Sequence, residues 1–508
     1  MRTEVRTRER EEATIRSVKD GVYEEVTDMG PERRLEPRPQ TKIVATLGPA
    51  SADKIGELIE QGMSVARINF SHGKREELRE LIAAVRTESK ARQSSVGILC
   101  DLPGPKMRLG SFEGGSHELE VDEVYVLRDG GELAGQGEIY LDCAGALGAV
   151  RPGDRVLVAD GAAELIVEEY IEGGLRARVS RGGRVTDRKG LHLPDSDIEY
   201  ELPTPADREW IEFAKEAGAD FLGVSFVGNG EDLIRIRALA PEQSIVAKVE
   251  RRVAVENLDG ILEQADGLMI ARGDLGVEMD LERLPMVQKD LLAAGLRAGC
   301  FTITATEMLE SMITTTRPTR AEVTDVANAI FDRTDGIMLS AETAVGENPV
   351  EAVRTMRNIA LAVEESERFQ ALPKVEHSED QIETADAVSM AAVQCAGVLG
   401  VDKIVCFSET GNTVRLMSRY RPEASIFGLS PLLKTVRWMT ALANVRPVPV
   451  ARWSSLEDML QEGSKMLIER GYAESGELIV FVAGVPPGVA KTTNVMKVHR
   501  IGDPIRLH

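Results

Sequence analysis

The sequence is short of the residues that build disulfide frameworks, metal clusters and membrane spans. Its 508 residues include only five cysteines and six histidines, and aromatic residues make up 4%. The cysteines are odd in number, far apart and in no metal-ligand spacing, which indicates buried thiols in a reducing compartment. No segment approaches the roughly 18 apolar residues of a membrane span, and the N-terminus lacks the apolar run of a signal peptide. We therefore expect a cytoplasmic protein without a membrane partner.

Basic residues are also in deficit. The chain has 61 Lys and Arg against 83 Asp and Glu, a net charge of −22. Such a charge repels nucleic-acid phosphates and anionic membrane surfaces, so nucleic acid is excluded as a main partner. The 43% apolar and 28% charged content is that of a globular protein. A chain of this length predicts roughly three to four domains.

Eight short β-branched segments alternate with amphipathic stretches, which is typical of parallel βα units. Eight is the number that a closed (β/α)₈ TIM barrel needs, so the sequence predicts this α/β fold. The segments are residues 42–49, 65–72, 95–104, 221–227, 244–250, 267–274, 301–306 and 336–343.

Three further regions flank or interrupt the barrel. The first 39 residues contain nine basic and ten acidic residues and cannot form a core of their own. The gap after the third segment is too long for one helix and is rich in Gly and short alternating runs, which predicts an inserted all-β domain. The end of the chain alternates strands and helices again. We expect an N-terminal extension (1–39), a two-part barrel (40–104 and 202–370), a β domain (105–201) and a C-terminal α/β domain (384–508).

Polar side chains occur at the ends of the predicted barrel strands. The C-terminal ends of such strands meet at one mouth, where barrel enzymes have their active sites. Some polar residues are needed at the rim of any barrel to cap the strand ends, but this set is larger than that purpose requires. It comprises Arg67, Asn69, Ser71, Asp101, Arg108, Lys248, Glu250, Arg272, Asp274, Thr306, Ser340 and Glu342.

The charges in this set indicate a reaction class. Glu250 and Asp274 are hard oxygen ligands on neighbouring strands, suited to Mg²⁺ or Mn²⁺. Arg67, Arg108 and Lys248 add positive charge suited to phosphoryl oxygens. No histidine–serine pair or catalytic cysteine is evident in these segments, which disfavours a covalent nucleophile. The set predicts metal-assisted phosphoryl or enolate chemistry.

Residues 41 to about 353 also resemble the pyruvate kinase family. The matching segments, in order, are TKIVATLGPAS, GMSVARINFSHG, DLPGPKMRLG, KGLHLP, AKVE, ARGDLGVE, ATEMLESM, RPTRAEVTDVANAI and IMLSAETAVGENPVEAV. The resemblance implies transfer of a phosphoryl group from phosphoenolpyruvate to ADP, giving pyruvate and ATP in glycolysis. It also implies that the β domain is a lid, that the C-terminal domain is regulatory, and that the enzyme is a homotetramer.

The resemblance implies roles for five residues at the mouth. Lys248 would stabilise the phosphoryl group in flight and Arg67 would contact it. Glu250 and Asp274 would hold the divalent ion. Asp274 and its neighbour Gly273, at a helix start that attracts anions, would bind the substrate carboxylate with Thr306. Thr306 would also lie near the proton delivered to the enolate.

A second set is implied to contact the nucleotide. Arg108, which also belongs to the catalytic set, and Lys189 match phosphate contacts. Asp160 matches a lid acid that closes over the metal–nucleotide complex. His72 and Pro49 complete the expected nucleotide-binding set.

One departure from the family pattern bears on monovalent cations. Many members bind K⁺ through an Asn, a Ser, an Asp and a Thr carbonyl, with a Glu nearby. Here Asn69, Ser71 and Asp101 are present, but Leu102 replaces the Thr and Lys106 replaces the Glu. A lysine ammonium can supply the charge that K⁺ otherwise supplies. We expect Lys106 to act as an internal cation, so that K⁺ is not required.

The C-terminal domain contains a candidate effector site. The segment SETGNT follows a predicted strand, and hydroxyl groups with a glycine at such a turn form a phosphate cradle. It resembles the family's effector loop. Glu409 within it opposes a doubly phosphorylated ligand, so we expect a monophosphorylated effector. The expected effector-binding residues are Ser408, Thr410, Gly411 and Thr413.

Two other functions are weighed against this one. A carbon–carbon lyase or aldolase could use the same Mg²⁺-enolate barrel, but it needs no ADP clamp of the kind that Arg108, Lys189 and Asp160 indicate. An inactive effector-binding scaffold would not need to keep Lys248 and Glu250.

Overall fold

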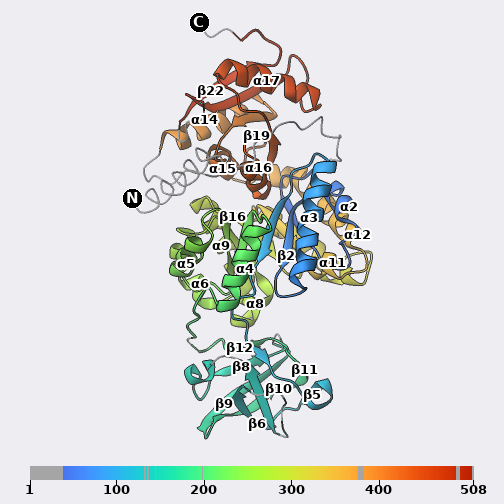
Figure 1. Ribbon diagram of the computed structural model, residues 1–508, viewed down its shortest axis with the longest axis vertical. Coiled ribbons are helices and arrows are strands. Elements are labelled where there is room, and N and C mark those ends of the chain that lie inside the picture. Colours follow the sequence, from blue (N-terminus) through green and yellow to red (C-terminus); the bar gives the residue numbers. More distant parts are fainter. Residues whose placement is uncertain are drawn as a thin grey trace.

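The computed structural model describes residues 38–130, 133, 135, 137–142, 145–159, 161–196, 198–373, 375, 383–487 and 492–505. Nearly all of the expected N-terminal extension and the candidate nucleotide-binding residue Asp160 lie outside these residues. Figure 1 shows three domains in a row, with the barrel between the β domain at one end and the C-terminal α/β domain at the other.

Eight parallel strands close into a barrel, as the sequence predicts. In four of the strands the sequence contributes five residues that are all buried, because the barrel interior covers one face and the surrounding helices cover the other. Continuous apolar runs therefore replace the alternating pattern of half-exposed strands. In spatial order the strands are β1 (Lys42–Thr46), β2 (Met63–Asn69), β3 (Gly97–Asp101), β13 (Phe221–Val224), β14 (Ser244–Val249), β15 (Gly267–Ala271), β16 (Phe301–Ala305) and β17 (Gly336–Leu339).

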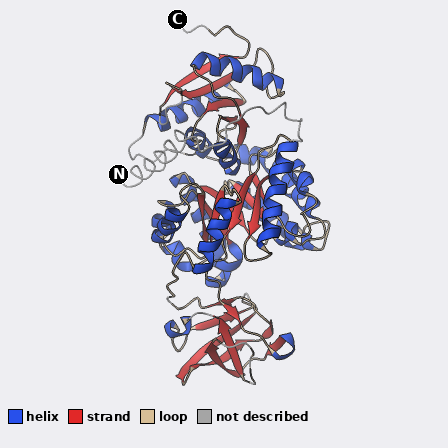
Figure 2. Cartoon of the chain, viewed as in Figure 1, coloured by secondary structure: helices blue, strands red, loops and turns tan. Residues whose placement is uncertain are grey.

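Helices surround the barrel (Figure 2). The helix after the insertion begins at Pro205, where Thr204 and Asp207 cap each other's backbone N–H groups at 3.0 Å. The helices are α2 (Ile55–Glu60), α3 (Arg75–Ala91), α4 (Pro205–Glu216), α5 (Gly230–Leu239), α6 (Arg252–Glu256), α7 (Leu258–Leu262), α8 (Arg272–Glu278), α9 (Leu284–Ala298), α10 (Arg320–Phe331), α11 (Ala341–Ala344), α12 (Pro349–Glu364) and α13 (Glu367–Gln370).

The insertion between β3 and β13 is a β domain with its own apolar core. Seven of its strands form one sheet and two form a separate pair. Alternation of buried and exposed residues along β9 and β10 shows that one face of the sheet packs inward. The strands are β4 (Arg108–Leu109), β5 (Ser116–Leu119), β6 (Val124–Asp129), β7 (Glu138–Asp142), β8 (Arg155–Val158), β9 (Ala163–Ile171), β10 (Gly174–Arg181), β11 (Gly183–Thr186) and β12 (Leu191–His192).

The C-terminal domain is a five-stranded sheet in the order β20-β19-β18-β21-β22, with only β22 antiparallel to its neighbour. Helices pack against it, as expected for a smaller α/β domain. Its elements are α14 (Thr384–Leu399), β18 (Lys403–Phe407), α15 (Asn412–Arg419), β19 (Ser425–Ser430), α16 (Leu433–Trp438), β20 (Val445–Pro449), α17 (Leu456–Glu469), β21 (Leu478–Gly484) and β22 (Thr493–Arg500).

The C-terminal domain packs on the base of the barrel, near the N-terminal ends of its strands. Val44 and Val65 from the barrel share one apolar core with Met417 of α15. Buried Asp335, just before β17, forms an ion pair of 2.8 Å with Arg421. The base of the barrel is therefore covered, and the C-terminal mouth is left for the β domain. Among the described residues, no helix has the length and apolar character needed to cross a bilayer.

Candidate active site

The mouth of the barrel contains a buried cluster of charges centred on Lys248, near the end of β14. Its ammonium group donates to Ser225 Oγ at 2.7 Å and lies 2.8 Å from Glu250 Oε1 and 3.3 Å from Asp101 Oδ2. The Lys248 residue is only 8% exposed. The lysine is thus held by groups from three adjacent strands or their ends, which restricts its rotamers and fixes its charge in place.

Asp101, the last residue of β3, joins this lysine to a second cation. Its Oδ2 atom accepts from Arg67 Nε at 2.9 Å and from Arg67 Nη2, while Arg67 Nη1 donates to Thr46 Oγ1 at 3.1 Å. Asp101 is 1% exposed, and its Oδ1 atom has no hydrogen-bond partner among the described residues. One carboxylate oxygen therefore positions both Arg67 and Lys248.

Burial and charge pairing act against each other at this cluster. Burial, the largest effect, lowers the pKa of Lys248, but Asp101 and Glu250 outweigh it and the net pKa is raised. Burial raises the pKa of Glu250, and Lys248 offsets this only in part. Burial also opposes ionisation of Asp274, but Lys106 and Lys248 lower its pKa overall. Lys248 is consequently cationic and Asp274 anionic at neutral pH.

The first turn of α8 meets the end of β16 beside this cluster. The backbone N–H of Gly273 donates to Thr306 Oγ1 at 2.8 Å, and Thr306 Oγ1 donates to the Ala305 carbonyl at 2.6 Å. Thr306 has φ = +70°, which is unfavourable for a β-branched residue and is common at functional sites. Arg272 holds this conformation by donating to the Thr306 carbonyl at 2.6 Å.

Lys106 lies beside the expected metal ligand. Its ammonium is 3.1 Å from Asp274 Oδ1, and both side chains are partly buried. The expected monovalent-cation residues lie at the ends of β2 and β3 or just after them. Asn69 Oδ1 accepts from the Ser71 backbone N–H at 3.0 Å. Leu102 is buried, and its carbonyl accepts from Ser225 Oγ at 2.8 Å. The structure therefore fixes the charge of Lys106 next to Asp274.

Glu250 and Asp274 form a donor set that fits Mg²⁺ or Mn²⁺. Mg²⁺ commonly uses one or two carboxylates and completes its octahedron with water and substrate oxygens. Glu250 Oε2 accepts from the Phe226 backbone N–H at 2.7 Å, which orients the carboxylate. Within the described residues, no group of three or more His, Cys, Asp or Glu gathers as a self-sufficient metal site. The donor set thus suits an ion shared with substrate rather than a structural metal.

The expected nucleotide contacts are more dispersed. Arg108, on β4, is half-buried and donates to the Arg188 carbonyl at 3.0 Å. Lys189, His72 and Pro49 have exposed side chains. The described residues place Arg108 and Lys189 in the β domain and the other two on loops after β1 and β2.

Sequence reasoning missed several groups that orient the cluster. Ser225 contacts Lys248, and Thr46 contacts Arg67. Thr46 is the last residue of β1 and Ser225 directly follows β13, whereas the predicted segments 42–49 and 221–227 extend past both residues. The Phe226 contact with Glu250 could not be predicted from residue type, because it is made by a backbone N–H group. His192, on β12, lies 3.7 Å from Asp274 and 3.6 Å from Glu278, a proximity that only the docking of the β domain creates.

The expected effector loop joins β18 to α15. The Gly411 backbone N–H donates to Ser408 Oγ at 2.9 Å, and Gly411 has φ = +80°. A Cβ atom at Gly411 would lie 2.7 Å from the Trp438 ring. Both this close approach and the positive φ therefore favour glycine at this position. Thr413 Oγ1 lies 2.5 Å from Thr493 Oγ1 on β22.

The rest of this loop is tied to its neighbours. The Thr410 hydroxyl accepts from the Asn412 backbone N–H at 3.5 Å. Glu409 pairs with Arg452 at 2.9 Å, and the Glu409 carbonyl accepts from Thr435. The negative charge of Glu409, which the sequence analysis identified as opposing a bisphosphate, is therefore paired with the guanidinium group of Arg452.

Comparisons with known proteins decide the family. Residues 38–353 match the family model "Pyruvate kinase, barrel domain" and residues 386–499 match "Pyruvate kinase, alpha/beta domain". The chain belongs to the pyruvate kinase family. Pyruvate kinases are phosphotransferases that act on phosphoenolpyruvate and ADP, and this chain is one of them.

Individual relatives agree with the family models. The chain is 40% identical over 462 residues to a pyruvate kinase of Methylorubrum extorquens, covering 90% of this chain and 97% of that one. It is 38% identical over 476 residues to a pyruvate kinase of Staphylococcus aureus, covering 92% and 81%. A pyruvate kinase structure from Cryptosporidium parvum matches with a TM-score of 0.84 and 32% identity, covering 91% and 96%.

The contact between Ser225 and Lys248 generates a prediction. Ser225→Ala removes a hydrogen bond to a buried charged group, which is worth about 1.5–3 kcal/mol. We expect kcat for pyruvate formation to fall about 10- to 100-fold, with a smaller change in KM for phosphoenolpyruvate. Steady-state kinetics on folded protein checks this.

Ser389→Ala is the matched control. Ser389 is fully buried in α14 and donates to the Ala385 carbonyl at 2.7 Å, remote from the mouth. We expect its kcat to stay at the wild-type value. A Ser225→Ala enzyme with wild-type kcat would show that the hydroxyl does not position Lys248.

Proposed function

We propose that the barrel mouth transfers the phosphoryl group of phosphoenolpyruvate to ADP and then directs protonation of the enolate to give pyruvate. The observation that carries this proposal is the buried pair of cations, Lys248 and Arg67, fixed by the single acid Asp101. Phosphoryl transfer depends on positioning and on charges that match the three equatorial oxygens. Lys248 stabilises the phosphoryl group during its transfer, and Arg67 contacts the phosphoryl group of bound phosphoenolpyruvate.

Glu250 and Asp274 would hold Mg²⁺ or Mn²⁺. When bound, the ion supplies positive charge to the enolpyruvate and phosphoryl oxygens. The carboxylates are prepared for this role by the Phe226 N–H on Glu250 and by the pKa of Asp274, which burial would raise but Lys106 and Lys248 lower.

Gly273, Asp274 and Thr306 are proposed to bind the substrate carboxylate. The Gly273 N–H and the Thr306 hydroxyl already meet at 2.8 Å, so both can turn to a carboxylate oxygen at the same point. The hydrogen bond from Thr306 Oγ1 to the Ala305 carbonyl, 2.6 Å long, orients this hydroxyl, which would then lie near the proton delivered to the enolate.

ADP is proposed to bind between the barrel and the β domain, which acts as a lid. Arg108 and Lys189 would contact its phosphates from the lid, with Asp160 closing over them, and His72 and Pro49 would contact it from the barrel. We also propose that residues 105–201 form the lid, residues 384–508 form the regulatory domain, and residues 40–104 and 202–370 form the two parts of the barrel. The comparisons give no support to a lyase or an inactive scaffold.

Lys248→Ala tests the reaction itself. The variant removes the charge that meets the migrating phosphoryl group, so we expect kcat to fall about 10²- to 10³-fold or more. Pyruvate formation with Mg²⁺ measures this, and circular dichroism verifies folding. Lys215→Ala is the control, because Lys215 is a partly exposed lysine on α4 that pairs with Glu212. Absence of pyruvate formation by folded wild-type enzyme would refute the function.

We further propose that the enzyme works without K⁺ because Lys106 provides an internal cation. Its ammonium is already fixed 3.1 Å from Asp274, and a covalently attached charge does not exchange with solvent. Two of the oxygens that would ligate K⁺ already accept hydrogen bonds within the protein, the Leu102 carbonyl from Ser225 Oγ at 2.8 Å and Asn69 Oδ1 from the Ser71 backbone N–H at 3.0 Å.

A K⁺ titration in Na⁺-free buffer tests this role. We expect wild-type activity to change less than twofold between zero and 100 mM K⁺. Lys106→Gln removes the charge, so its activity should fall at least tenfold and recover in part with K⁺. Strong K⁺ activation of the wild type would contradict the proposal.

The loop after β18 is proposed as the effector site of an allosteric homotetramer. Ser408, Thr410, Gly411 and Thr413 would surround one phosphate group. The pairing of Glu409 with Arg452 leaves a balanced charge at the edge of the loop, which favours a monophosphorylated ligand over a bisphosphate.

Hydrogen exchange tests this site. We expect ribose 5-phosphate to protect the amides of residues 408–413, and Thr413→Ala to weaken this protection. Protection by fructose 1,6-bisphosphate but not by the monophosphate would contradict the choice of ligand.

A further inference from the structure

The β domain is joined to the barrel by two linkers, and both contact Phe226, in the loop after β13. The entry linker runs from β3 to β4 and contains Gly104, and the exit linker runs from β12 to α4. A Cβ atom at Gly104 would lie 3.0 Å from Phe226 Cδ2. The Tyr200 ring, on the exit linker, meets the Phe226 ring edge to face, with the centroids 6.1 Å apart and an angle of 73° between the planes. Phe226 therefore lies between the two segments through which the β domain is attached.

Phe226 is also the residue that orients Glu250. Its backbone N–H donates to Glu250 Oε2 at 2.7 Å. Its φ is +58°, which is unfavourable for an aromatic residue, and a backbone in this region persists only where its surroundings hold it. Phe226 is 7% exposed, so the packing of its ring against the two linkers supports the conformation that directs its N–H toward the carboxylate.

Arg251 holds the exit linker beside Phe226. It directly follows Glu250 in the chain and is buried. Its Nη2 atom donates to the Ile198 carbonyl at 2.7 Å, and its guanidinium carbon lies 4.3 Å from the centroid of the Tyr200 ring. A planar guanidinium group can stack on an aromatic ring and donate a hydrogen bond at the same time. One side chain at the end of β14 thus contacts two residues of the linker.

The other end of the exit linker is anchored independently of Arg251. Leu202 is buried in the barrel core, and its carbonyl accepts from Arg235 Nε, on α5, at 2.6 Å. Residues 198–200 lie between this anchor and the β domain. A movement of the β domain therefore reaches the contacts of Tyr200 and Arg251 before it reaches the barrel core.

We propose that Arg251 and Tyr200 are positioning residues for the reaction, which hold the exit linker against Phe226 and thereby set the orientation of the Glu250 carboxylate. This inference rests on the proposed role of Glu250 as a ligand of the divalent ion. Arg251 is covalently joined to Glu250 and Tyr200 to the linker, so their contact couples the position of the β domain to the geometry of the metal ligand.

Hydrogen exchange at the Phe226 amide tests this coupling in the protein without metal or substrate. We expect Arg251→Met and Tyr200→Ala each to speed this exchange several-fold, because the hydrogen bond to Glu250 loses its support. Tyr200→Phe keeps the ring that Arg251 and Phe226 contact, so it should exchange at the wild-type rate. Unchanged exchange in both Arg251→Met and Tyr200→Ala would overturn the proposal.

Arg368→Met is the matched control for the arginine substitution. The Arg368 guanidinium carbon also lies near an aromatic ring, 5.6 Å from the centroid of Phe331. Phe331 ends α10, which leads into β17 at the base of the barrel, away from the linkers. We expect this variant to leave exchange at the Phe226 amide unchanged, and equal acceleration in Arg368→Met and Arg251→Met would contradict a specific role for Arg251.

Binding of Mn²⁺ to the protein alone, measured from the electron paramagnetic resonance signal of free Mn²⁺, provides a second readout. Residues that orient a metal ligand typically contribute about 10- to 100-fold to metal affinity. We expect Glu250→Gln and Arg251→Met each to weaken Mn²⁺ binding about tenfold or more. Because Arg251 acts through Glu250, Arg251→Met should cause no further loss in a Glu250→Gln background.

The outcomes distinguish this inference from the proposed function. Weakened binding in Glu250→Gln with wild-type affinity in Arg251→Met would overturn the role of Arg251 and keep Glu250 as a ligand. Wild-type affinity in Glu250→Gln would overturn the role of Glu250, and the inference with it. Additive losses in the double variant would show that Arg251 acts independently of Glu250 and would also contradict the inference. Thermal melting verifies folding, and Tyr200→Ala replaces Arg251→Met in this series should the latter fail to fold.

Discussion

Two cations buried side by side are the constraint on which the catalytic mouth depends. Lys248 and Arg67 repel each other and are costly to remove from water. Asp101 makes their proximity possible, because one of its oxygens accepts hydrogen bonds from Arg67 and forms an ion pair with Lys248. Removing one partner of a buried pair leaves an uncompensated charge. The positions of β2, β3 and β14 around the barrel are therefore tied to the chemistry as well as to the packing.

The same balance of charges prepares the mouth for its ligands. Lys248 and Lys106 are close to Glu250 and Asp274, the two carboxylates that would share a divalent ion with substrate. In the protein alone, the ammonium groups compensate these acids. The arriving substrate adds negative charge to a mouth in which cations are already oriented, so little reorganisation is needed at the moment of transfer.

Much of this site could be predicted from the sequence, because a polar residue is the last of each barrel strand or directly follows it, and such ends converge by topology. Arg67, Asp101, Lys248, Glu250 and Thr306 were found in this way. The partners of these groups were harder to predict. The Lys106–Asp274 pair joins residues 168 positions apart, and no local pattern indicates which acid a flexible lysine side chain will reach.

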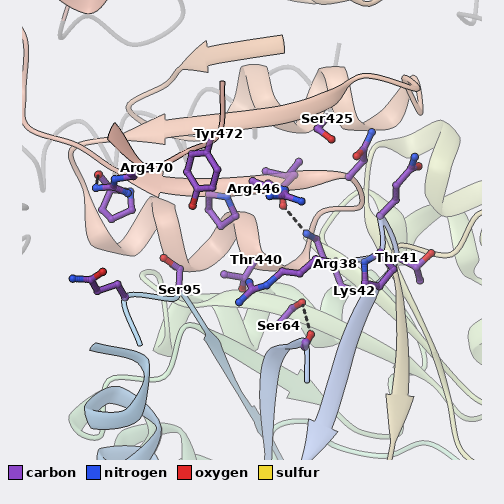
Figure 3. Close-up of a pocket in the computed structure, with 18 of the residues that line it drawn as sticks. Arg38, Thr41, Lys42, Ser64, Ser95, Ser425, Thr440, Arg446, Arg470 and Tyr472 are labelled. Atoms are coloured by element: carbon purple, nitrogen blue, oxygen red, sulfur yellow. Dashed lines mark hydrogen bonds between the residues drawn. The ribbon is translucent and has the colours of Figure 1, made fainter. Parts of the chain in front are cut away.

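The sequence by itself determined the eight barrel strands, the inserted β domain, the C-terminal α/β domain and the main charged residues of the mouth, because periodicity and strand-end chemistry are local properties. Only the tertiary structure decided how those charges pair, how Thr306 is held in a strained conformation, and which residues line the cavity of about 310 Å³ between the base of the barrel and the C-terminal domain (Figure 3). Arg38, Lys42, Arg446 and Arg470 come from both ends of the chain. They meet only because the C-terminal domain packs on the N-terminal ends of the strands.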